Sequence, residues 1–328
     1  KYAWALNDNV NFGATTEVFG PIHSNAGIRF DGVAHNLVTS ALPDYNDPDH
    51  LGANEFGVHT HKAPIDPLPP AAVPNRSDVF MAGRQFPVPV LDFSGITQNL
   101  AQIKTDAQAS GFYAPSTTVF GYDLLLKNNG TFDLFRVNTV VNIPPGCSTS
   151  TWSIQSETLL GNYPYPANGL IFLEDNAWIR GQVSSTRITI ASGRFPDNPA
   201  TRSDIIINND IRYTSYDGQD TIGLSAQNTI TIGLMSHDIL RVDAALIAQN
   251  GRIGRFFYNP SSCGSTSLRA QFISYGIMGS NKRSAFFYGS SGYQARSYTY
   301  DTNLLYSPPP SYPAAGNQYV QLSWEEVK

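Results

Sequence analysis

The residues best suited to chemistry gather in one polar segment, YNDPDHLGANEFGVHTH (residues 45–61). His59 and His61 would point to the same side of a strand, a spacing that suits two ligands of one metal ion. The acidic side chains nearby could instead offer oxygen ligands to calcium. Because turn-rich polar stretches are common without a metal, we expect a solvated loop and assign no metal ligand. The other candidates weighed here are Asp44, Asp47, Asp49 and His50.

A second set of acids lies between residues 169 and 255. A polysaccharide lyase or hydrolase needs clustered carboxylates and a base on one exposed face. Most of these acids stand in turn-like contexts, where Asp bonds its own backbone. We therefore predict no enzyme, no catalytic residue and no cofactor, and keep a β-helical carbohydrate-active enzyme as the alternative. The acids are Glu174, Asp175, Asp197, Asp204, Asp210, Asp217, Asp220, Asp238 and Asp243.

Other chemical motifs are missing from the sequence. It contains no phosphate-binding loop, nucleophile elbow, zincin helix or CxxC metal pair. We interpret His23, His35 and His237 as hydrogen-bonded turn or core residues. Two tyrosine-rich stretches, residues 162–166 and 284–300, could either contact glycans or proteins or fill the core. Both interpretations stay open.

Composition narrows the class of protein. Charged residues make up 14% of the chain, the net charge is -5 and the pI is near 5.6, so no basic surface favours nucleic acid or an anionic membrane. The low charge with abundant Tyr, Gly and Pro is typical of extracellular β-proteins. In that setting we expect Cys147 and Cys263 to form a disulfide.

The elements that must position these residues are short apolar runs separated by Asn, Asp, Gly and Ser between residues 169 and 255. This pattern predicts a mainly β fold, a right-handed parallel β-helix-like stack of short rungs. An apolar residue recurs every 18 positions, which suggests coils of about that length. The recurring residues are Leu170, Ile188, Ile206, Leu224 and Val242.

We divide the chain into first β rungs (1–40), an insertion (41–168), a β-helix body (169–306), and a Pro-rich connector with a closing strand (307–328). Prolines make regular strands improbable across residues 41–89, so we expect a long excursion there. Within the insertion, Asn129-Gly130 predicts a hairpin over residues 122–137. A covering helix is expected from an N-cap at Ser94 to a stop at Gly111, with one apolar face. That face comprises Ile96, Leu100, Ile103 and Ala107.

Five phrases together resemble the ectodomains of PilX-like, type IV pilus-associated surface proteins of bacteria. They are FGPIHSNAGIRFDG (19–32), FPVPVLDFSGI (86–96), GLIFLEDNAWIRGQVSSTRITIAS (169–192), DIIINNDIRYTSYDGQDTIGLSAQNTITI (204–232) and LRVDAALIAQNGRIGR (240–255). The resemblance implies a surface location, a β-rich region containing a parallel β-helix, and no known catalytic residues.

We therefore expect a non-enzymatic, extracellular structural or adhesive protein, pilus-associated or part of another surface assembly. Its expected partners are other surface or pilus subunits, with glycans as a further candidate and a glycan-binding module as a second alternative function. No membrane span is present in the sequence, so we expect membrane attachment only through a leader or anchor upstream of Lys1. The Pro-rich excursion at residues 41–89 is the expected contact region.

Overall fold

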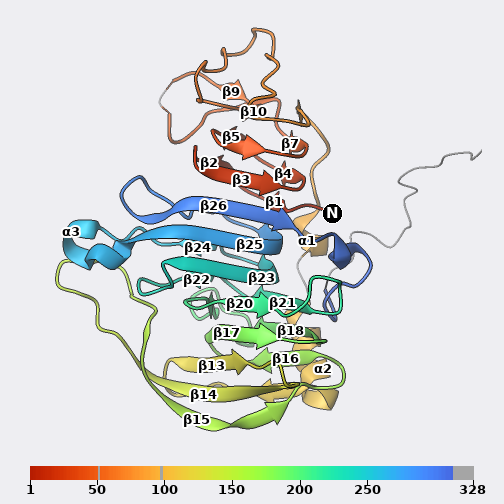
Figure 1. The fold of residues 1–328 in the computed structure, drawn as a ribbon, viewed down its shortest axis with the longest axis vertical. Coiled ribbons are helices and arrows are strands. Elements are labelled where there is room, and N and C mark those ends of the chain that lie inside the picture. Colours follow the sequence, from red (N-terminus) through yellow and green to blue (C-terminus); the bar gives the residue numbers. More distant parts are fainter. Residues whose placement is uncertain (51, 97–98, 313–328) are drawn as a thin grey trace, which may run out of the picture.

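The protein is a tall stack of short β-strands, seen from the side in Figure 1. The structure is a computed structural model and describes residues 1–50, 52–96 and 99–312. Successive coils pair their strands in parallel, which confirms the prediction of a mainly β, β-helix-like stack. The pairings form three ladders that run along the stack.

The first ladder is the longest and holds the most regular register. From one end of the stack to the other, it consists of β12 (Phe112–Ala114), β16 (Leu170–Leu173), β18 (Arg187–Ser192), β21 (Thr221–Ala226), the second halves of β23 (Ile239–Ala248) and β25 (Leu268–Ser280), β1 (Trp4–Leu6), β4 (Ile22–Ser24), β7 (Val38–Ser40) and β11 (Arg84–Gln85).

The other two ladders complete each coil. The second consists of β13 (Gly121–Leu126), β17 (Ala177–Val183), β20 (Ile211–Tyr213), the first halves of β23 and β25, β26 (Gly292–Tyr300), β3 (Thr16–Phe19) and β6 (Val33–Ala34). The third has two parts: the start of β17 with β19 (Ile205–Ile206), β22 (Ile230–Ile232) and β24 (Ile253–Arg255), and β2 (Val10–Phe12) with β5 (Ile28–Phe30) and β10 (Val58–His59).

The core is a set of columns of apolar side chains in register. Parallel pairing places the same face of each strand above the next, so one inward position per coil forms a continuous buried column. All members of the main column are almost fully buried. In stacking order they are Ile171, Ile190, Leu224, Leu246, Met278, Trp4, Ile22 and Val38.

The expected 18-residue period is wrong. All five residues that define it are buried, but none is the register partner of another. Ile171 and Ile190 are 19 residues apart, whereas the next partners, Ile190 and Leu224, are 34 apart. The spacing varies because connecting loops of different length join strands of similar length.

The chain begins in the middle of the stack (Figure 1). Residues 1–92 form the coils from the middle to the upper end of Figure 1. The chain then returns along the side of the stack through α1 (Phe93–Ile96) and α2 (Leu100–Ser110). From the opposite end, residues 112–300 climb back until β25 and β26 pair with β1 and β3. The two parts of the chain therefore meet at a seam inside one continuous stack.

The two ends of the stack are covered differently. At the lower end of Figure 1, β13 and β14 (Thr131–Val140) form the predicted hairpin, and β15 (Ile154–Pro164) continues the antiparallel pairing. At the upper end lies the Pro-rich excursion, where the expectation of no regular strands is wrong. It contains β10 and β11, which extend two ladders, and the antiparallel pair β8 (Asp44–Tyr45) and β9 (Glu55–Phe56).

The predicted covering helix is present but starts later. Asn99, not Ser94, caps α2 by accepting a hydrogen bond from the Gln102 backbone N–H. Its face of Leu100, Ile103 and Ala107 packs on the outer side of β16, against Leu170 and Phe172, and Gly111 ends it as expected. The side chain of Ile96 and the expected closing strand at residues 319–327 lie outside the described residues.

The remaining elements are short. They are α3 (Pro260–Cys263) and the 3-10 turns η1 (Ser265–Ser267) and η2 (Thr302–Leu305). The expected disulfide is present, and it joins Cys263, at the end of α3, to Cys147 in the loop between β14 and β15. The bond therefore fastens the lower hairpin region to a coil near the middle of the stack. In the part of the chain that the structure describes, no helix is both long and apolar enough to cross a membrane.

Candidate functional site

The acids of the coils mainly accept hydrogen bonds from the backbone of a neighbouring coil, and we call an acid that does so a clamp. We expected them to bond within their own turns. Asp217 does so alone, by accepting the Gln219 backbone N–H, and Asp175 and Asp220 do so in addition to their contacts with other coils. Most of the acids accept a backbone N–H group that lies 25 to 58 residues away in the chain. The pairs, with the N–H donor first, are Thr229 and Asp204, Arg241 and Asp210, Thr186 and Asp220, Ala270 and Asp238, Tyr213 and Asp243, and Thr117 and Asp175.

Asp220 is the most complete of these clamps. Its side chain is 1% exposed and accepts three backbone N–H groups, from Thr186 at 3.1 Å and from Thr214 and Ser215 at 2.9 Å each. The remaining two acids are paired with side chains instead, Glu174 with Lys104 and Tyr113, and Asp197 with Arg202. An acid that is already hydrogen-bonded in this way is poorly placed to exchange protons with a substrate.

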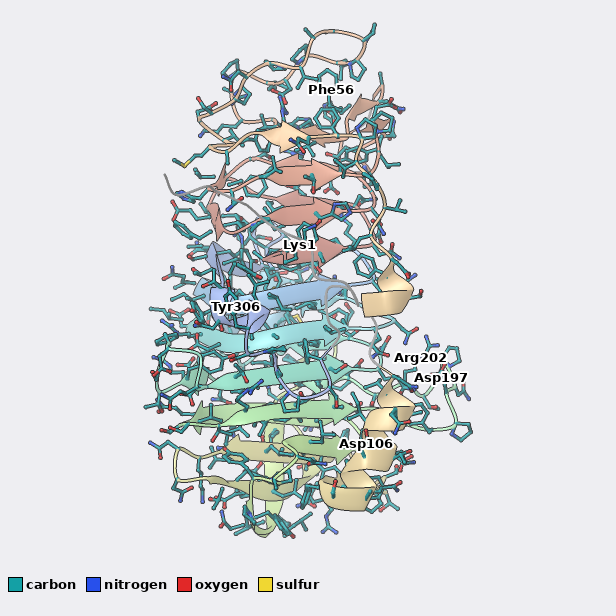
Figure 2. The ribbon with its side chains drawn as sticks, turned by 90° about the vertical axis from the view of Figure 1, so that its right-hand side faces the viewer. Lys1, Phe56, Asp106, Asp197, Arg202 and Tyr306 are labelled. Atoms are coloured by element: carbon teal, nitrogen blue, oxygen red, sulfur yellow. A yellow bond between two sulfur atoms is a disulfide. The ribbon has the colours of Figure 1, made fainter. Side chains whose placement is uncertain are left out.

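The polar segment at residues 45–61 is a solvated loop only in part: residues 48–50 and 52–54 are exposed as predicted, but the side chains on either side of them are not. Asp47, Glu55 and His59 are 3%, 4% and 1% exposed, and His61 is half-buried. One donor atom from each of these four residues lies within 4.8 Å of the other three. We call this group the His/carboxylate cluster. It lies in the upper coil of the stack, beside Phe56, which is labelled in Figure 2.

The sequence pattern identified three of the four members. His59 and His61 do point the same way, and each reaches Glu55, with Nε2 of His59 2.7 Å from Oε2 and Nε2 of His61 2.5 Å from Oε1. Asp47 Oδ2 lies 3.7 Å from His59 Nε2. Glu55 was missed, although its position four residues before His59 could have indicated it.

The other three candidates of that segment do not join the cluster. Asp44 accepts from the Asn54 side chain, and Asp49 pairs with Arg283 across the seam. His50 is at the edge, with Nδ1 3.1 Å from Glu55 Oε1 and its side chain half exposed.

A second hollow lies at the lower hairpin, lined by residues that the sequence analysis did not single out as candidates. Arg180 on β17 contacts Asp123 on β13 at 2.8 Å and Glu157 on β15 at 3.2 Å. The adjacent hollow of about 360 Å³ also reaches Trp178. Burial raises the pKa of the Asp123 carboxyl well above its ordinary 3.8, because the loss of solvation outweighs the attraction of Arg180.

A cavity of about 610 Å³ opens at the seam. The third ladder is interrupted there. Among the described residues, β2 pairs with β5 alone, and Ala285 on the other side pairs with Gly254 alone. Phe286 and Tyr298 from the tyrosine-rich stretch line this cavity and are 5% and 4% exposed.

Most rings of the two aromatic stretches therefore contribute to the core. Tyr293 is fully buried, and Tyr163 and Tyr165 pack against the main core at the lower end. Two of the three isolated histidines are hydrogen-bonded as expected, His23 to Thr39 and Asn25, and His237 to Asp210. His35 instead stacks on Phe19, and its Nε2 has no hydrogen-bond partner among the described residues.

Comparison with known proteins does not assign this chain to a family. No protein-family model and no curated protein matches the chain. Among solved structures, the competence-associated pilin ComZ from Thermus thermophilus is similar over 99% of this chain and 75% of that one, with 10% identity and a TM-score of 0.39. A likeness at this level carries no argument about function.

Proposed function

We propose that this protein is a non-enzymatic structural or adhesive component of the cell surface, associated with a pilus or with another extracellular assembly. The observation that carries the proposal is the use of the coil acids as clamps between coils. A polysaccharide-degrading enzyme would expose such carboxylates on one face, whereas here they hydrogen-bond one coil to the next and hold the stack rigid.

Two further features support an extracellular scaffold. A disulfide between distant segments is typical of oxidising compartments. A continuous stack with both ends covered presents few unpaired strand edges, which suits display or spacing of partners without aggregation. The association with a pilus rests on the resemblance of the five sequence phrases, and the expected partners are other surface or pilus subunits.

Shearing of native host cells tests the assembly part of the proposal. Surface fibres released by shear should contain this protein together with the major fibre subunit, and deletion of that subunit should remove it from the sheared fraction. A protein that stays with the cell body after shearing and is unaffected by the deletion would contradict the association with a fibre.

A carbohydrate-active or glycan-binding role is the second candidate, and the hollow at Asp123 and Glu157 favours it. A carboxyl with a raised pKa, Asp123, near a second carboxyl and a tryptophan is a combination that glycoside hydrolases use. Release of reducing ends from a panel of acidic and neutral polysaccharides by wild-type protein, lost in Glu157→Gln, would support an enzyme. Saturable binding to the same panel without release would support a glycan-binding module.

A further inference from the structure

We propose that the His/carboxylate cluster is a binding site for one divalent transition-metal ion, with Zn²⁺ as the best fit. Asp47, Glu55, His59 and His61 supply two imidazole nitrogens and two carboxylate oxygens. This donor set suits Zn²⁺ and its neighbours in the first transition row, whereas Ca²⁺ and Mg²⁺ prefer oxygen alone.

The orientation of His59 points to a cation. Its Nδ1 lies 3.2 Å from the carbonyl oxygen of Phe56, and because a carbonyl can only accept, Nδ1 must carry the proton. Metal-binding histidines are held in this way by a second hydrogen bond, which directs the other nitrogen at the ion. Nε2 of His59 therefore faces the carboxylates of Glu55 and Asp47.

The facing atoms have few partners besides one another. Asp47 Oδ2, Glu55 Oε2 and His59 Nε2 are all buried and lie close together as ion pairs, but within the described ranges none of their contacts has hydrogen-bond geometry. Unsatisfied buried polar atoms are costly, and three of them aimed at one point are rare in a folded protein. A bound ion would satisfy all three at once.

Charge leads to the same conclusion. The cluster buries two carboxylates, and the nearest arginine, Arg29, is 3.8 Å from Asp47 while it pairs more closely with Asp31 at 2.8 Å. A dication would balance Asp47 and Glu55 without a further partner.

The cluster is also held in place from outside. Asp31 accepts the His61 backbone N–H at 2.7 Å, and Asp66 accepts that of Thr60 at 3.1 Å. Asp47 Oδ1 accepts the Asp49 backbone N–H at 3.0 Å, which leaves Oδ2 for the ion. Ligands of a tetrahedral Zn²⁺ lie about 3.3 Å apart, so the four donors need only small shifts to close around it.

Four protein ligands in a buried site describe a structural centre rather than a catalytic one. The ion would tie the segment from Asp47 to Glu55 to β10, which belongs to the upper coil of the stack. Binding would therefore stabilise the covered upper end. This inference does not rest on the proposed function.

Metal titration of the chelator-stripped protein tests the proposal. Wild-type protein should bind one Zn²⁺ per chain, and its thermal midpoint should rise with Zn²⁺ but not with the same concentration of Ca²⁺. His59→Gln and Glu55→Gln should bind Zn²⁺ at least about 100-fold more weakly, since loss of outer-shell partners alone costs 10- to 100-fold. Asp44→Asn, in the same segment but outside the cluster, should bind like wild type.

Cobalt substitution gives a readout that does not depend on the folding of a variant. Wild-type protein loaded with Co²⁺ should show the intense visible bands of a tetrahedral centre, and Zn²⁺ should abolish them. Failure of the wild-type protein to bind Zn²⁺ stoichiometrically, equal binding by His59→Gln, an equal thermal response to Ca²⁺, or a weak octahedral Co²⁺ spectrum would each overturn the proposal.

Discussion

Trp4 and Met278 are paired neighbours in adjacent coils, although 274 positions separate them in the chain. Both side chains are almost fully buried in the main column. The rings of Phe12, Phe286 and Tyr298 surround Trp4 edge-on. This contact is the centre of the seam that makes two segments of the chain into one stack.

Trp4→Ala should therefore destabilise the whole stack. Removal of a buried tryptophan typically costs about 3 to 5 kcal/mol, because transfer energy is lost and a cavity is left. Urea denaturation would measure the loss in unfolding free energy. Phe19→Ala is the matched control, since Phe19 is 40% exposed on the seam strand β3, and equal losses in the two variants would contradict a seam held by Trp4.

Reduction of the Cys147–Cys263 bond should also lower stability. The two cysteines are 116 positions apart, and for a loop of that length the chain-entropy model gives about 4 to 5 kcal/mol. Denaturation with and without reductant would measure the difference. The double variant Cys147→Ser/Cys263→Ser should match the reduced wild type and ignore reductant, and a reductant-insensitive wild type would show that the bond contributes nothing.

Asp220→Ala should be strongly destabilising because it strips three backbone N–H groups of their acceptor. At about 1 kcal/mol or more for each unsatisfied donor, the unfolding free energy should fall by about 3 kcal/mol or more. Asp217→Ala removes an acid from the same loop that is exposed and bonds only within its turn, so its stability should stay near wild type. Comparable losses for the two would disprove the clamp role.

The Asp123 carboxyl should make stability depend on pH in an unusual direction. Its folded pKa lies above the unfolded value of about 3.8, so the folded state holds a proton that the unfolded chain has released. The contribution of this bound proton to the unfolding free energy is therefore complete below about pH 4 and is lost as pH rises towards the folded pKa of Asp123.

Asp123→Asn, which mimics the protonated acid, should remove this loss. Relative to wild type, the variant should gain stability steadily from pH 4 to pH 8 in urea titrations, while Asp217→Asn should not. A constant difference between Asp123→Asn and wild type over that range would mean that Asp123 is ionised throughout.

The sequence predicted the local elements better than their arrangement. Apolar runs between Asn and Gly identified the coils, and Asn129-Gly130 identified the hairpin, because both signals are written in neighbouring residues. The coil length was mispredicted, since loops of unequal length separate register partners such as Ile190 and Leu224. The pairing of Trp4 with Met278 depends on contacts across almost the whole chain, which spacing cannot reveal.

The same limit applies to the sites. His59 and His61 lie two residues apart on an extended segment, so their common direction could be predicted. The approach of Asp47 and Glu55 depends on how the excursion folds over the upper coil, and a proline-rich segment gives no periodic signal for that path. Asp123, Arg180 and Glu157 meet only because three strands pair, and no local motif marks them.

The central claim is that this stack works outside the cell, and labelling of intact native cells tests it most directly. A membrane-impermeant amine reagent should label the protein as fully on intact cells as after lysis, while a cytosolic marker protein is labelled only after lysis. Labelling of this protein only after lysis would contradict the claim.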